Sequence, residues 1–232
     1  MKTVLITGAN RGIGLQFTKQ YAEAGYTVFA TTRTPLESAE LNALANKLGN
    51  IKVLSLDITD EKQIAGIKSM LNGQAIDILI ANAGYYGPKD ETSQFGQLDQ
   101  VEWLKTLHIN TIAPLKFAEA LIDNLLLGNE RKIAFLSSKM GSMTDNGSGG
   151  SYIYRSSKAA LNAATKSLAI DLAEYDVKVV ALHPGWVLTD MGGPNALINS
   201  ETSVKGMRSV INKLTEKTSG SFVAYDGQPI PW

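Results

Sequence analysis

The sequence places Tyr154 and Lys158 four residues apart, at the start of a segment whose apolar residues have helical spacing. Residues at this separation share one face of a helix, so we expect the two side chains to lie together. A free phenol ionises near pH ~10, and making its phenolate available at pH 7 takes roughly 4 kcal/mol. A nearby ammonium favours the phenolate, so the pair can act as an acid–base group toward a carbonyl or alcohol oxygen. The spacing alone also suits an amphipathic helix with a solvated lysine.

A glycine-rich turn follows the first apolar run of the chain. Its sequence is Thr7-Gly8-Ala9-Asn10-Arg11-Gly12-Ile13-Gly14. Between a strand and a helix, such a turn binds the pyrophosphate of a dinucleotide at the helix N-terminus. We expect Gly8 to make the tight turn, Gly12 to let the phosphates approach the backbone, and Gly14 to let the helix pack on the strand. An ordinary strand–helix turn is the alternative, and three glycines so close together argue against it.

The glycine spacing is T-G-x-x-x-G-x-G rather than G-x-G-x-x-G, and in this it resembles the short-chain dehydrogenases/reductases. Other motifs of that family follow in order and span most of the chain. The segments 161–168 and 226–232 further resemble a subgroup with sniffer-type carbonyl reductases and the bacterial C-factor. The matching motifs are Asn82-Ala83-Gly84, Asn110, Ser138, the Y-x-x-x-K motif Tyr154-Arg155-Ser156-Ser157-Lys158, Pro184-Gly185 and Thr189.

The resemblance implies a role for each catalytic candidate. Tyr154 would exchange a proton with the substrate oxygen, which Ser138 would polarise. Lys158 would hold the nicotinamide ribose. Asn110 would use its backbone, near a helix kink, to hold a water that relays protons to Lys158. Ser142 is an alternative to Ser138: the separations from Tyr154 are 154 − 138 = 16 and 154 − 142 = 12 residues, and the first is longer than is usual in the family. We prefer Ser138 because it directly follows an expected strand.

The second expected strand ends at Thr32-Arg33 with no acidic residue to bond a ribose 2′-hydroxyl. Arg33 can pair with a 2′-phosphate instead, and Arg11 can approach it from the glycine turn. We therefore expect NADP(H) to be preferred, with NAD(H) left open. Two solvated arginines are the alternative. The resemblance further places Asp57 at the adenine ring and Thr189 at the carboxamide. The full set of expected cofactor contacts is Gly8, Asn10, Arg11, Gly12, Ile13, Gly14, Arg33, Asp57, Ile58, Asn82, Ala83, Gly84, Tyr154, Lys158, Pro184, Gly185, Val187 and Thr189.

Apolar side chains flank the expected nicotinamide site, and a mostly apolar pocket suits a small carbonyl compound or alcohol. Packing of these side chains under their own loops is the alternative. The residues concerned are Tyr85, Tyr86, Met140, Met143, Trp186 and Met191.

Strands and helices alternate along the sequence, which predicts an α/β chain of the Rossmann type. We expect one domain over residues 1–232, with a doubly wound, mainly parallel, seven-stranded sheet and helices on both faces. Ligands bind such sheets beyond the carboxyl ends of the strands. The expected strands are 3–7, 27–32, 52–56, 76–81, 132–136, 178–182 and 222–225. The expected helices are 13–24, 36–48, 60–71, a long helix from Asp99 with a capping box to Glu102 and a kink or boundary at Pro114, and 152–174.

Composition narrows the classes of function. A hydrophobic fraction of 44% with 19% charged residues predicts a folded chain, and 22 basic against 22 acidic residues indicate neither nucleic acid nor an anionic membrane as a partner. The absence of cysteine excludes thiol chemistry and cysteine-ligated metals. No secretory signal or membrane span is apparent, so we expect a cytoplasmic location. The resemblance also implies a homodimer or homotetramer, paired through the helices from Asp99 and Tyr152.

Two other functions compete with carbonyl reduction. An NADP(H)-binding signalling or scaffold protein of the C-factor type would need little turnover, and the intact Tyr154 and Lys158 pair argues against it. An epimerase or dehydratase on a similar framework carries a larger C-terminal substrate region, whereas only 232 − 189 = 43 residues follow Thr189 here.

Overall fold

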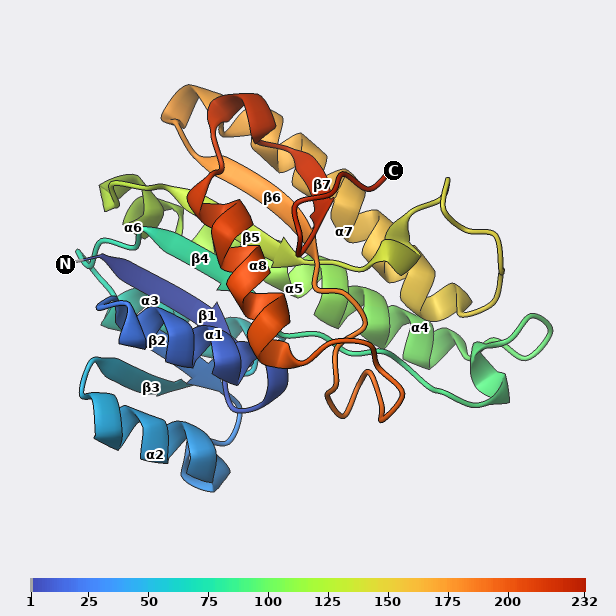
Figure 1. Cartoon of the computed structure of the whole chain (residues 1–232), viewed down its shortest axis with the longest axis horizontal. Coiled ribbons are helices and arrows are strands. Elements are labelled where there is room, and N and C mark those ends of the chain that lie inside the picture. Colours follow the sequence, from blue (N-terminus) through green and yellow to red (C-terminus); the bar gives the residue numbers. More distant parts are fainter. Residues whose placement is uncertain (1) are drawn as a thin grey trace.

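The computed structural model describes residues 2–232, and within them seven strands form one sheet in the order β3-β2-β1-β4-β5-β6-β7 (Figure 1). Every neighbouring pair is parallel, so the predicted Rossmann-type architecture is confirmed and the sheet is parallel throughout. The strands are β1 (Thr3–Thr7), β2 (Thr27–Thr32), β3 (Ile51–Ser55), β4 (Ile78–Ala81), β5 (Lys132–Leu136), β6 (Lys178–His183) and β7 (Ser221–Ala224).

Helices cover both faces of the sheet because the central strands are apolar on both sides (Figure 1). Successive residues of β1 point to opposite faces: Leu5 belongs to one buried cluster, and Val4 and Ile6 to the other. The Leu5 cluster includes residues of α3 (Glu61–Met70), α5 (Ala113–Ala120), α6 (Ile122–Leu127) and α7 (Tyr152–Asp171). The opposite cluster includes residues of α1 (Gly12–Glu23), α2 (Ala39–Leu48) and α8 (Ser200–Asn212).

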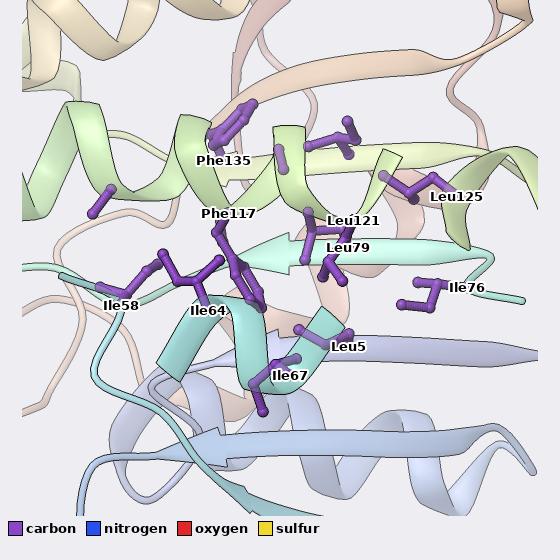
Figure 2. Packing of buried hydrophobic residues seen from close by; sticks show 14 of the residues in the cluster. Leu5, Ile58, Ile64, Ile67, Ile76, Leu79, Phe117, Leu121, Leu125 and Phe135 are labelled. Carbon is purple, nitrogen blue, oxygen red and sulfur yellow. The ribbon is translucent and has the colours of Figure 1, made fainter. Parts of the chain in front are cut away.

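Large side chains fill the first of these layers. Figure 2 shows Leu5 and Leu79 on the sheet beside Ile64, Ile67 and Phe117 from the overlying helices. Each is less than a tenth exposed. Burying one such side chain contributes about 1.5–3 kcal/mol, so this layer holds the helices against the sheet.

The long helix predicted from Asp99 is interrupted. Asp99 accepts hydrogen bonds from the N–H groups of the first turn of α4 (Gln100–Leu107). A π-helical segment, η3 (His108–Ile112), follows, and α5 begins at Ala113 with Pro114 in its first turn. The backbone stays helical at Leu107, Ile112 and Ala113, so Pro114 lies inside a continuous helical stretch. Because proline has no N–H, a carbonyl of the preceding π-turn lacks its usual helical donor, and the predicted kink lies at this irregularity. Of the predicted capping box, the Asp99 cap forms and the return bond from Glu102 does not. The Glu102 carboxylate instead accepts hydrogen bonds from the side chains of Tyr85 and Lys105.

Other differences from the expected elements lie at their ends. The helix expected over 36–48 begins at Ala39, after the 3₁₀ turn η1 (Pro35–Glu37). The strand expected from 76 begins at Ile78, and the last long helix ends at Asp171 before the 3₁₀ turn η5 (Ala173–Tyr175). Helix α8 was not predicted, although Val204, Met207 and Ile211 form an apolar stripe at helical spacing. The remaining 3₁₀ turns are η2 (Glu91–Ser93), η4 (Lys139–Gly141) and η6 (Glu216–Thr218).

The strand order reverses between β1 and β4, so the chain leaves these neighbours toward opposite faces of the sheet. A crevice opens between the two outgoing loops at such a point. The loops after β1, β4, β5 and β6 all lie at this edge. Among residues 2–232, no helix has the length and apolarity needed to cross a membrane.

Candidate active site

The glycine turn is closed by direct packing of backbone on backbone. A Cβ atom at Gly14 would lie 2.1 Å from the carbonyl oxygen of Gly8 and 2.6 Å from Nδ2 of Asn82. Asn82 Nδ2 donates to the main-chain oxygens of Thr7 at 2.9 Å and Gly8 at 3.0 Å. Oγ1 of Thr7 accepts from the N–H groups of Asn82 and Ala83, both at 3.0 Å. The Asn82 side chain thus braces the turn from the neighbouring strand, and α1 starts close against β1.

The loop after β6 reaches the same turn. Gly12 has φ +53°, and a Cβ there would lie 3.2 Å from Cγ2 of Thr189. Two contacts hold this loop in place. Ser203 Oγ donates to the Pro184 oxygen at 2.6 Å, and Val187 pairs with Ile198 in a short β-bridge. The expected cofactor residues that follow β1 and β6 therefore lie next to one another.

The two arginines expected at a 2′-phosphate differ in their contacts. Arg33 is exposed at the end of β2. Arg11 forms an ion pair with Asp190, whose side chain is also well exposed, next to Thr189. Asp190 was not predicted from the sequence, although it is the only charged residue between 184 and 199 and opposite in sign to Arg11.

Other expected cofactor residues serve partly as framework. The Asp57 carboxylate accepts from the Thr59 N–H at 2.9 Å and its hydroxyl at 2.7 Å, which shapes the turn after β3. The Ile58 side chain lies in the hydrophobic core, so it is not free to contact a ligand. Asn10 and Ile13 are half-buried in the turn before α1. Gly185 has φ +84° and lies against Tyr225 and Ile198.

Tyr154 and Ser138 come together at the carboxyl end of β5. Tyr154 is only 7% exposed, and burial raises the pKa of its phenol to about 12, against the opposing effect of a hydrogen bond with Ser138. Ser138 Oγ also accepts from the Met140 N–H at 3.1 Å. The expected lowering of this pKa by Lys158 is not found, because desolvation of the phenolate dominates. The Tyr154 phenol therefore keeps its proton at neutral pH.

Lys158 is buried on the same helix face as Tyr154. Its Nζ donates to the Leu136 main-chain oxygen at 2.8 Å and lies 5.8 Å from the centre of the Tyr154 ring. Burial lowers the pKa of Lys158 to about 8. A Cβ at Gly84 would lie 3.7 Å from this Nζ and 3.4 Å from Oδ1 of Asn110. Gly84 thus lies between the lysine and the asparagine.

Asn110 lies in the π-turn and is almost fully buried. Its Oδ1 accepts from the Tyr85 N–H at 2.8 Å, and its Nδ2 donates to the Tyr85 oxygen at 2.7 Å and to Ser157 Oγ at 3.0 Å. These bonds connect the loop after β4 to α7. Because the side chain is used in this way, any relay through Asn110 must run through its main chain.

The two tyrosines after β4 point to different places. The Tyr86 ring stacks on the Tyr154 ring, with centres 4.5 Å apart and planes at 25°. The Tyr85 hydroxyl instead donates to Glu102 on α4 at 2.9 Å. Lys89 Nζ lies 5.6 Å from the centre of the Tyr86 ring and donates to the Met191 oxygen at 3.2 Å. The structure thus brings Tyr86 to the proposed acid and leaves Tyr85 on the framework.

The remaining pocket candidates are partly open to solvent. Trp186 is 50% exposed, and its Nε1 donates to the Gly192 oxygen at 2.7 Å. Met140 and Met143 line a cavity of about 330 Å³ beside α7, whose walls include neither Tyr154 nor Ser138. Within residues 2–232, no group of three or more His, Asp or Glu side chains is arranged to hold a metal ion.

Comparison with known proteins gives consistent matches. A family model described as short chain dehydrogenase matches residues 2–198. The C-signal of Myxococcus xanthus is 43% identical over 157 residues, covering 68% of this chain and 93% of that protein. The solved carbonyl reductase Sniffer of D. melanogaster is 38% identical, with a TM-score of 0.91 and 100% of both chains covered. An NADPH-bound carbonyl reductase from chicken fatty liver is 34% identical, with a TM-score of 0.91, covering 100% of this chain and 99% of that one.

Replacing Lys158 with Met is expected to stabilise the protein at pH 7. The pKa of Lys158 is about 8 in the folded protein against its usual 10.5, so the folded state carries an unfavourable term when the lysine is charged. Removing the charge relieves on the order of 3 kcal/mol at pH 7, and losing the hydrogen bond to Leu136 costs about 1 kcal/mol. The net gain in the free energy of unfolding corresponds to a Tm rise of roughly 5 °C.

Tm measured against pH tests this expectation. The unfavourable term is fully present below pH 8 and disappears as the pH rises toward 10.5, so the gain from Lys158→Met must shrink over that window. Lys166→Met, at an exposed position on the same helix, is the control and has no such pH-dependent effect. A Tm gain that is independent of pH would contradict the electrostatic explanation.

Proposed function

The chain belongs to the short-chain dehydrogenase family, and from that premise we propose that it reduces small carbonyl compounds with NADPH, with Tyr154 as the proton donor. The observation that carries the proposal is the burial of Tyr154 beside the carboxyl end of β5, with Lys158 Nζ 5.8 Å from the centre of its ring and Ser138 close enough to affect the pKa of its phenol. This group lies at the carboxyl ends of the strands, beside the crevice at the strand-order reversal. The carbonyl reductases among the similar structures support the same class of reaction.

The glycine turn fits a dinucleotide cofactor. The space that a Cβ at Gly14 would fill is already occupied by the Gly8 carbonyl, so α1 can present its first N–H groups close to a bound pyrophosphate. Arg33 and Arg11 would hold the 2′-phosphate, and Thr189 would close over the other side. The NADPH bound to the chicken reductase supports this choice of cofactor. Bound there, the cofactor supplies the hydride for reduction and accepts it in the reverse direction.

A protonated Tyr154 suits the proton-donor role in carbonyl reduction. A phenol with a pKa of about 12 is a proton donor at neutral pH, and a carbonyl oxygen needs a proton as it becomes an alcohol. Ser138 would hydrogen-bond the same oxygen and stabilise its developing charge. Lys158 would hold the nicotinamide ribose, and the Asn110 main chain would hold the water that returns a proton toward Lys158.

Ser142 is unsuited to the role proposed for Ser138. Ser142 is 2% exposed, and its hydroxyl donates to the Pro231 main-chain oxygen at 2.6 Å. A substrate oxygen would have to break that bond to reach it. This supports Ser138 as the polarising serine.

A second candidate function is an NADP(H)-binding signalling protein. The 43% identity to the Myxococcus C-signal favours it. A sensor, however, has no need of a buried tyrosine hydrogen-bonded to Ser138, since cofactor binding alone does not use that group.

A homo-oligomer is also part of the proposal. Its support is a row of exposed apolar side chains along α4 and the π-turn, where Val101 is 73%, Leu104 59% and Ile112 52% exposed. Such a row suits contact with another apolar surface.

Purified protein is expected to consume NADPH with at least some members of a panel of aldehydes, ketones and quinones, and to consume NADH more slowly. Absorbance at the reduced nicotinamide band measures both rates. Tight NADPH binding with no turnover on the whole panel would reject the reductase and leave the signalling protein.

Tyr154→Phe is expected to lower turnover by roughly 10²–10⁴-fold, because the proton donor is lost. The NADPH dissociation constant, measured by fluorescence titration, stays within a few-fold. Tyr152→Phe removes a hydroxyl from a more exposed tyrosine on the same helix and is the matched control. Tyr154 is not the proton donor if the Tyr154→Phe variant keeps most of its activity.

Arg33→Ala is expected to weaken NADPH binding by roughly 10- to 100-fold and to leave NADH binding unchanged, because one charge-assisted bond to a phosphate is lost.

Asp190→Asn is expected to tighten NADPH binding by a few-fold, because Arg11 no longer has a competing carboxylate. The effect is small because the ion pair is solvated. Titration of each variant with both cofactors measures these changes. Parallel changes for NADH and NADPH would reject recognition of the 2′-phosphate.

A further inference from the structure

The loop that carries Ser138 is fastened to the helix that carries Tyr154 and Lys158. A Cβ at Gly141 would lie 2.8 Å from the main-chain carbon of Lys158, so the two backbones are in direct contact. Asn162 extends this contact by accepting from Ser137 Oγ at 2.6 Å. The position of Ser138 relative to Tyr154 therefore depends on where the residues after Ser138 are held.

The far side of the same loop is held by residues 228–232, which we name the clamp segment. Ser142 Oγ donates to the Pro231 oxygen at 2.6 Å. The N–H groups of Met143 and Thr144 donate to the Trp232 main-chain oxygen at 3.1 and 3.0 Å. Ser142 Oγ in turn accepts from the Asp145 N–H at 3.1 Å. The loop lies outside every strand and α-helix, so these bonds supply partners for its main-chain N–H groups.

The clamp segment is itself anchored on the edge strand β7. The Gln228 oxygen accepts from the Ala224 N–H at 2.8 Å, and the Ile230 N–H donates to the Phe222 oxygen at 2.9 Å. Ile230 is 8% exposed, and the Trp232 ring stacks on Phe222 with ring centres 5.6 Å apart. The edge of the sheet is thus linked to the loop through one short segment, in which Ile230 is buried and the other four residues are exposed.

We propose that the clamp segment is a positioning element of the active site, which holds the 138–144 loop through Ser142 and Trp232 so that Ser138 stays against Tyr154. The inference rests on the proposed function, because positioning of Ser138 matters only if Ser138 acts on a substrate oxygen. It gives Ser142 a definite role: its hydroxyl bonds the clamp segment and not the substrate.

Two pairs of variants separate positioning from simple destabilisation. Ser142→Ala removes the hydroxyl and Ser142→Thr keeps it. Trp232→Ala removes the ring that rests on Phe222, and Trp232→Phe keeps an aromatic ring there. Tyr175→Ala, at an aromatic residue 48% exposed on η5 and remote from the clamp, is the control for loss of an exposed ring.

Both Ala substitutions in the clamp are expected to lower kcat roughly tenfold, since misplacement of a group that acts in the transition state lowers the rate of the chemical step. KM and the NADPH dissociation constant stay within a few-fold. Ser142→Thr and Trp232→Phe keep kcat near that of the parent, as does Tyr175→Ala. Hydrogen–deuterium exchange of the peptide covering 139–146 becomes faster in the two Ala variants, while exchange in β5 does not change.

The two readouts distinguish the possible failures. Unchanged exchange of 139–146 in the Ala variants overturns the clamp itself. Faster exchange with an unchanged kcat overturns the positioning role, because the loop is then held for stability alone. Absence of turnover in the unsubstituted protein overturns the proposed function, and the positioning role with it.

Discussion

The contact between Gly14 and the Gly8 carbonyl limits how the rest of the site can be built. No side chain fits between them, since a Cβ at Gly14 would come within 2.1 Å of that oxygen. Helix α1 therefore starts closer to β1 than any other residue would allow, and Asn82 from β4 bonds the turn from the side. This places the loop after β4 beside the glycine turn. That placement also brings Gly84, in the loop after β4, close to the side chains of Asn110 and Lys158.

Burial sets the electrostatic character of the site more than the pairing of charges does. Tyr154 and Lys158 share a helix face, yet the lysine donates to the Leu136 oxygen, and both groups have pKa values displaced toward their neutral forms. Desolvation opposes the charge on each, and the Ser138 hydrogen bond only partly offsets it for the tyrosine. The site is therefore arranged around a neutral proton donor, and binding of a charged group nearby would change that balance.

The fold could be predicted from sequence because periodicity and glycine placement report on it directly. The apolar strands, the three glycines of the first turn and the order of the later motifs were sufficient to predict a doubly wound, mainly parallel sheet, whereas its strand order comes from the structure. Helix α8 was not predicted, although Val204, Met207 and Ile211 have helical spacing and Asn199 caps the helix, so this signal in the sequence was missed. The π-turn at Asn110 was expected only as a kink, because no residue type specifies the extra residue in a helical turn.

Within the site, residue types were predicted better than their contacts. The group Tyr154, Ser138 and Lys158 assembles where the spacing and motifs indicated. The pairing of Arg11 with Asp190, the turn of Tyr85 toward Glu102 and the bond from Ser142 to Pro231 depend on loop paths. Loops have no periodic pattern of buried residues, so their conformations could not be predicted from the sequence.

The clamp segment also affects how copies of this protein meet one another. Strand β7 lies at the edge of the sheet, and an uncovered edge is a template for pairing with another chain. Residues 228–230 cover part of it, with Val223 and Pro229 forming an antiparallel bridge, and Pro229 has no N–H to offer a further strand. Loosening this segment would bare the β7 edge while it releases the Ser138 loop, so resistance to aggregation and order at the proposed catalytic site depend on the same few residues.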